Sequence, residues 1–200
     1  MRNLIVFVGV VLFFVHCGER KASEGVVING VRWATSNVDA PGTFAPTPES
    51  PGKFFQWNRR RGWNVTDETI ENWDIYYARG LRWNRRNDPC PAGWRVPTRR
   101  ELQSLYNAGA EWVTQNGVEG LLFGNAPYQL FLPAVGFREV LEGRLSSAGK
   151  WGSYWSSTQT MFSWAYHLIF FDIQEKHIGS GNDMISHDRA LGKSIRCVAR

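Results

Sequence analysis

Nucleophiles and carboxylate pairs are the residues most able to carry chemistry, and their spacing in this 200-residue chain indicates no catalytic centre. Ser156 and Ser157 could attack an acyl group only beside a base, and neither lies in the Gly-x-Ser-x-Gly pattern that exposes such a serine. Glu68, Glu71 and Asp74 could form an acid–base pair for glycoside cleavage, but their spacing is typical of a solvated face. We therefore predict no catalytic residue and a protein that is not an enzyme.

Metal ligation is not indicated by the histidines and aspartates of the second half either. The histidines there are His167, His177 and His187. Their separations do not match the His-Glu-x-x-His spacing of a helical zinc site. The aspartates that could contribute oxygen ligands for calcium are Asp172, Asp183 and Asp188. They do not form the pattern of an EF-hand loop, so we expect no metal and no other cofactor.

The N-terminal segment has the features of an export signal. Arg2 supplies a positive charge, and the apolar run from Leu4 to Val15 is short for a membrane span but suits a signal-peptide core. Cys17 follows this run, as the lipidated cysteine of a bacterial lipoprotein does, although His16 replaces the small residue usual before it. We expect residues 1–17 to be a signal peptide of lipoprotein type and residues 18–25 a tether. Ordinary cleavage near the same place is the alternative.

Cys90 and Cys197 remain, and two cysteines in an exported chain are expected to pair. Closing a loop of about a hundred residues stabilises a fold by up to about 4–5 kcal/mol in the chain-entropy model. Two buried thiols are the alternative.

Composition indicates a globular domain without a nucleic-acid partner. The hydrophobic fraction of 43% is enough for a core, and ten tryptophans are an unusually large supply of rings. The net charge of +5 comes partly from short basic clusters at 59–61, 85–86 and 99–100. These clusters form neither a continuous stripe nor a nucleic-acid-binding motif, so a solvated rim is favoured.

Several segments have clear local signals. Val26 to Trp33 predicts a hairpin that turns at Asn29-Gly30, with alternate residues facing inward. Thr98 and Glu101 form a capping box that predicts a helix ending near Gly109. Further strands are predicted over 54–57, over 128–137 with an interruption at Pro133, over 164–173 as a central strand, and over 194–200 as a closing strand.

The segment from Gly62 to Gly80 has two interpretations. Ile70, Trp73 and Tyr77 have helical spacing, and Thr66 or Asp67 could cap such a helix. A long surface loop that carries aromatic residues is the alternative.

Blocks spread over residues 25–200 resemble, in order and spacing, the Fibrobacter succinogenes major paralogous domain, a family of exported bacterial proteins. The blocks are Ile28–Val38, Gln56–Asn58, Asn87–Thr98 with Glu101-Leu102, Leu132–Arg138, Tyr154–Thr158, and Arg189 with Gly192–Val198. The Gly93–Glu101 block is also similar to one in the formylglycine-generating sulfatase-modifying fold. The resemblance implies an α+β, C-type-lectin-like single domain over residues 26–200, with paired N- and C-terminal strands, one or two helices and long loops. It implies no particular reaction.

The candidate ligand-binding residues lie outside these blocks, among arginines and asparagines: Trp63, Trp73, Tyr76, Tyr77 and Trp83. Flat rings beside polar side chains suit stacking on sugars or anchoring a protein partner. The alternative is that these rings pack beneath their own loop. We expect a non-catalytic binding module on the outer membrane or surface of a Gram-negative bacterium, recognising a glycan or a surface protein and held to the membrane by lipid. The alternatives are a structural or tip component of a fimbrial assembly and a degenerate relative of the formylglycine-generating enzymes.

Overall fold

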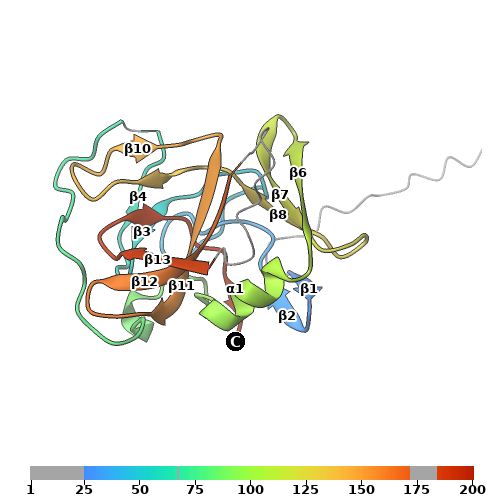
Figure 1. The fold of residues 1–200 in the computed structure, drawn as a ribbon, viewed down its shortest axis with the longest axis horizontal. Helices are drawn as coiled ribbons and strands as arrows, with labels where there is room; N and C mark the ends of the chain where they lie inside the picture. The colour runs from blue at the N-terminus through green and yellow to red at the C-terminus, as the bar shows by residue number, and fades with distance from the viewer. Residues whose placement is uncertain (1–24, 67, 172–183) are drawn as a thin grey trace, which may run out of the picture.

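A computed structural model describes residues 25–66, 68–171 and 184–200, whose arrangement is drawn in Figure 1. The predicted signal peptide with Cys17, and all of the tether except Gly25, lie outside the described residues, as do His177, Asp172 and Asp183. No helix of the described ranges is long and apolar enough to cross a membrane.

The first sheet joins the two ends of the described chain. Its strands, in spatial order, are β1 (Val26–Ile28), β2 (Val31–Trp33), β15 (Val198–Ala199) and β5 (Trp94–Arg95). The hairpin β1–β2 turns at Asn29 and Gly30, whose φ angles are 48° and 77°, as the Asn-Gly dipeptide predicts. Val198 lies opposite Trp33, so the predicted pairing of N- and C-terminal strands is confirmed.

The second sheet is made of very short strands from distant parts of the chain. Their order is β10 (Leu145–Ser146), β9 (Phe137–Arg138), β14 (Gly192–Lys193), β3 (Phe54–Gln56) and β4 (Gly62–Trp63). The predicted buried strand at 54–57 is present as β3, all of whose residues are buried.

The third and fourth sheets have longer strands. The third has the order β11 (Trp151–Gln159), β12 (Trp164–Phe171) and β13 (Met184–Asp188). The predicted central strand is confirmed, because β12 lies between the other two. The fourth contains β6 (Ala110–Gln115), β7 (Val118–Phe123) and β8 (Leu130–Pro133). The β6–β7 hairpin, which was not predicted, turns at a second Asn-Gly dipeptide, Asn116-Gly117.

The single α-helix of the described residues is α1 (Arg99–Tyr106), and its predicted capping box is present. The Thr98 hydroxyl accepts a hydrogen bond from the Glu101 backbone N–H at 3.3 Å, and the Glu101 carboxylate accepts one from the Thr98 N–H at 2.7 Å. Leu102 and Leu105 pack into a core cluster with the β1–β2 hairpin and the fourth sheet. One α-helix with four sheets makes this an α+β, mostly sheet structure.

The segment after β4 is a long loop rather than a helix. No α-helix lies in residues 62–66 or 68–80, and the next regular element is the 3₁₀ turn η1 (Arg85–Asn87). The helical interpretation was wrong: Trp73 is buried, whereas Tyr77, which helical spacing would put on the same face, is exposed. The loop interpretation is confirmed.

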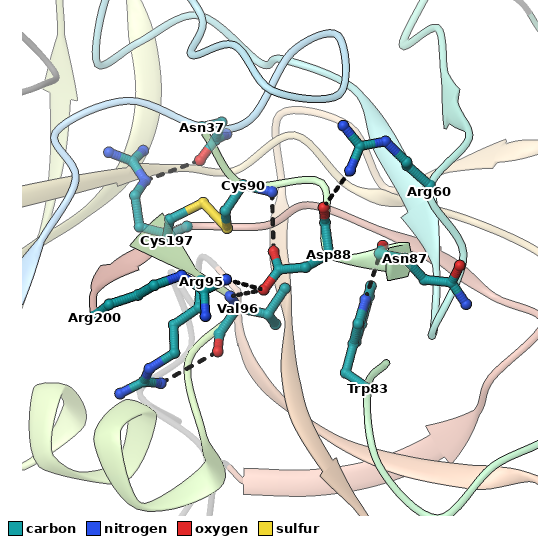
Figure 2. The surroundings of a disulfide bond; sticks show 11 residues. Asn37, Arg60, Trp83, Asn87, Asp88, Cys90, Arg95, Val96, Cys197 and Arg200 are labelled. Carbon is teal, nitrogen blue, oxygen red and sulfur yellow. Dashed lines mark hydrogen bonds and ion pairs between the residues drawn. A yellow bond between two sulfur atoms is a disulfide. The ribbon is translucent and has the colours of Figure 1, made fainter. Parts of the chain in front are cut away.

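Cys90 and Cys197 form the predicted disulfide, with Cα atoms 6.1 Å apart, inside a second core cluster (Figure 2). Asp88 orders the segment before α1, since its carboxylate accepts hydrogen bonds from the backbone N–H of Cys90 at 3.0 Å and of Val96 at 3.4 Å. The disulfide therefore ties a well-ordered turn to the chain leading into β15.

We predict that the Cys90→Ser/Cys197→Ser variant loses about 4 kcal/mol of unfolding free energy, because the unfolded chain regains the freedom of a long loop. Urea denaturation of the variant and the parent measures this loss. Reduction of the parent with dithiothreitol should lower its unfolding free energy by the same amount, measured as a fall in its urea midpoint. Peptide mapping that found both thiols free in the unreduced parent would contradict the pairing.

Candidate functional site

Three of the five candidate binding rings are buried. Trp63, Trp73 and Trp83 expose only 6%, 9% and 8% of their surface. The expectation that these rings are open to a ligand was therefore wrong for the tryptophans, and the alternative, that they pack beneath their own loop, describes them.

Contacts with distant segments explain this burial. The rings of Trp63 and Trp73 lie 5.2 Å apart, and the Trp73 indole N–H donates to the Val140 carbonyl at 3.0 Å. Trp83 packs on the buried Trp57 at 5.5 Å and donates to the Asn87 carbonyl at 3.0 Å (Figure 2). A buried indole needs such a partner for its N–H, and two of these rings find one in the backbone.

The tyrosines of the same loop face the solvent. Tyr76 and Tyr77 expose 74% and 44% of their surface, and Leu81 exposes 82%. Arg59, in the connection between β3 and β4, holds this part of the loop, because its guanidinium pairs with the Asp74 carboxylate and lies 3.4 Å from the Tyr76 carbonyl. We call Tyr76, Tyr77 and Leu81 the loop face.

A second group of exposed apolar side chains lies at the turn between β11 and β12. Phe162 exposes 87% of its surface, and Met161 and Trp164 are also exposed. This group was not among the residues predicted from the sequence. An apolar Met-Phe pair between two strands was the available signal, since strand connections are usually polar.

Buried Arg189 joins the loop face to this turn. Its guanidinium lies over the Trp57 ring at 4.2 Å and donates to the Gly80 carbonyl at 2.9 Å and to the Trp164 carbonyl at 3.3 Å. Burial lowers the pKa of Arg189, while electrostatic interaction with Tyr77 and Asp188 raises it. The two exposed segments are therefore held side by side by one buried cation.

Three cavities open along the loop from residue 58 to residue 85. One of about 540 Å³ is lined by Asn58, Asn84, Trp83 and the chain from Arg79 to Arg82, with Arg85. Two others, of about 460 and 440 Å³, share Arg61 and Trp63 in their walls. Guanidinium and amide groups beside exposed tyrosines are suited to bind hydroxyl-rich or charged ligands.

A buried chain of hydrogen bonds crosses the third sheet. Lys193 Nζ donates to Ser153 Oγ at 2.9 Å, and Ser153 Oγ lies 3.2 Å from His167 Nδ1. His167 Nε2 lies 3.2 Å from Nδ1 of the half-buried His187. The spacing of His167 and His187 in the sequence does not indicate this contact, which arises from the antiparallel pairing of β12 with β13. Within the described residues no group of three potential metal ligands is present.

Burial determines the protonation of the side chains in this hydrogen-bonded row. It lowers the pKa of Lys193 to about 7, and no carboxylate of the described residues is bonded to the amine. Burial, followed by the charge of Lys193 and by His187, lowers the pKa of His167 well below its ordinary value. Lys193, Ser153 and His167 are buried. These hydrogen-bonded side chains are therefore suited to hold the sheet together rather than to attack a substrate.

We predict that stability rises between pH 7 and pH 9. In this range the unfolded chain keeps the proton of Lys193, whose free pKa is about 10.4, while the folded chain releases it. The linkage relation gives a gain of about 2 kcal/mol, measured by urea denaturation at the two pH values. Lys193→Met should abolish this rise and Lys150→Met, at an exposed lysine, should retain it. An equal rise in all three proteins would show that Lys193 is not its source.

No family model, no curated protein and no solved structure matches this chain. The resemblance to the major paralogous domain and to the C-type-lectin-like fold therefore remains an expectation from the sequence blocks.

Proposed function

We propose that this chain is an exported, non-catalytic binding module that recognises glycans at the loop face. The observation that carries the proposal is the exposure of Tyr76 and Tyr77 on a loop whose cavities are lined by arginine and asparagine. A flat ring packs on the apolar face of a sugar, and the neighbouring amide and guanidinium groups hydrogen-bond its hydroxyls. The large tryptophans beneath keep the loop in place without contacting the ligand.

We place the module in the C-type-lectin-like class. Support comes from the pairing of β15 with β2 and from the long loop between β4 and η1. The disulfide is consistent with export. The resemblance to the formylglycine-generating enzymes would require a late cysteine that holds copper. Cys197 is bonded to Cys90 and offers no free thiolate, which disfavours that alternative.

A role in a surface assembly is the second candidate. The exposed Phe162 and Met161 favour it, because such a pair suits contact with a protein partner.

For localisation, we propose that Cys17 is lipidated and holds the module at the outer membrane or cell surface. We expect mass spectrometry of the mature protein to find a lipid-modified Cys17 as the first residue, since lipidation follows cleavage at that position. A Cys17→Ser variant should appear in the soluble fraction. An unmodified N-terminus, or one beyond residue 17, contradicts the anchor.

We predict that Tyr76→Ala and Tyr77→Ala each weaken glycan binding by about 2 kcal/mol, the usual effect of removing a stacking ring from a hot spot. The glycan is first selected by screening the purified protein on an array, and affinities are then measured by calorimetry. The melting temperature should stay unchanged, because exposed rings add little to stability.

Two variants serve as controls for this experiment. Tyr128→Ala removes an exposed ring on the β7–β8 connection and should bind normally. In Figure 1 this connection and the long segment after β4 lie on opposite sides of the molecule. Trp73→Ala should lower the melting temperature, because it empties a buried site. The proposal fails if the array shows no bound glycan, or if Tyr128→Ala weakens binding as much as Tyr76→Ala.

A further inference from the structure

We propose that the cavity lined by Arg79, Arg82 and Arg85 binds the acidic groups of an anionic polysaccharide, such as one carrying sulfate or uronic acid. This inference rests on the proposed glycan-binding function and names the class of glycan.

The charge of this segment is entirely positive. Between Ile75 and Asn87 the chain has four arginines and no aspartate or glutamate. Three of these arginines line the cavity of about 540 Å³, and among the described residues no aspartate or glutamate lines it. A cavity lined by several arginine side chains, without an acidic side chain among the described residues, favours a negatively charged ligand.

The guanidinium groups of the cavity are also unused. In the described part of the chain, neither a hydrogen bond nor an ion pair engages the side chains of Arg79, Arg82 and Arg85, all of which are exposed. Other arginines have partners: Arg59 and Arg95, for example, pair with carboxylates. A free guanidinium offers a planar set of donors that matches the oxygens of a sulfate or carboxylate.

The backbone beneath these arginines is held before any ligand arrives. Arg189 donates to the Gly80 carbonyl at 2.9 Å, and Asn58 Nδ2 donates to the Arg79 carbonyl at 3.0 Å. Asn58 Oδ1 accepts from the Asn84 N–H at 2.7 Å, and Asn58 adopts a φ of 58° in doing so. Since the carbonyls are bonded from the inside, the arginine side chains extend outward from a fixed frame. Binding then costs little ordering of the backbone.

The neighbouring loop face favours a polysaccharide over a small anion. Leu81 of the loop face is itself part of the cavity wall, and Tyr77 lies two residues before Arg79 in the chain. A ligand that stacks on a tyrosine while it places an acidic group among the arginines must carry both a sugar face and a negative charge.

The test compares dextran sulfate with neutral dextran by calorimetry on the purified protein. We expect at least tenfold tighter binding of dextran sulfate, and each of Arg79→Gln, Arg82→Gln and Arg85→Gln should weaken it about tenfold, the effect of losing one charge-assisted hydrogen bond. Affinity should fall as sodium chloride is added, because salt screens the charges. Unchanged melting temperatures would show that the variants fold.

The matched control is a pair of double variants with the same change in net charge. Arg79→Gln/Arg82→Gln should lose dextran sulfate binding, whereas Arg32→Gln/Arg100→Gln, at exposed arginines outside the cavity, should keep it. Equal losses in both would show attraction to overall charge and overturn the inference. Tighter binding of a single-stranded oligothymidylate than of dextran sulfate would also overturn it.

The two proposals fail in different ways. If array glycans bind and depend on Tyr76, but dextran sulfate binds no better than dextran, the glycan-binding function stands and the anionic specificity is wrong. If neither the array nor either dextran shows binding, both are wrong.

Discussion

The segment from Arg189 to Val198 runs through the interior of the domain, and three of the four sheets are hydrogen-bonded to it. Gly192 pairs with β3 and β9, Ser194 forms a bridge with Tyr154 of β11, and Val198 pairs with β2 and β5. The disulfide at Cys197 anchors the end of this segment to the turn before α1. Many of the strands are only two or three residues long, so their stability depends on this shared partner rather than on their own hairpins.

Buried cations perform a related task for the loops. Arg138, Arg189 and Arg196 are almost completely buried, and each donates to backbone carbonyls of irregular segments. Carbonyl groups outside helices and sheets need donors when they are buried, and one guanidinium provides five N–H groups. Burying a charge is costly unless it is well bonded, and these contacts offset that cost. Arg138 donates to the Asn64 carbonyl and Arg189 donates to the Gly80 carbonyl. Both arginines therefore hold the long loop from the interior of the domain.

This support divides the side chains of the loop into two groups. Trp63, Trp73 and Trp83 face inward, where their large rings fill space between sheets and loop. Tyr76, Tyr77 and Leu81 face outward, together with arginines that have no partner in the described part of the chain. The inward rings fix the loop, and the outward groups are free for a ligand. The glycan-binding function and the anionic specificity that we propose both depend on this division.

The sequence by itself determined the features that depend on residues close together in the chain, and the disulfide, for which few pairings were possible. The Asn29-Gly30 turn and the Thr98–Glu101 capping box were predictable because their hydrogen bonds form within a few residues, and Cys90 had one plausible partner. The orientation of the loop aromatics was decided by tertiary structure. Trp73 packs on Trp63 and donates its N–H to the Val140 carbonyl. Lys193 meets Ser153 because the chain at Ser194 forms a bridge with β11. Periodicity carries no information about such contacts, because each joins residues that are distant in the chain and adjacent only in the folded domain.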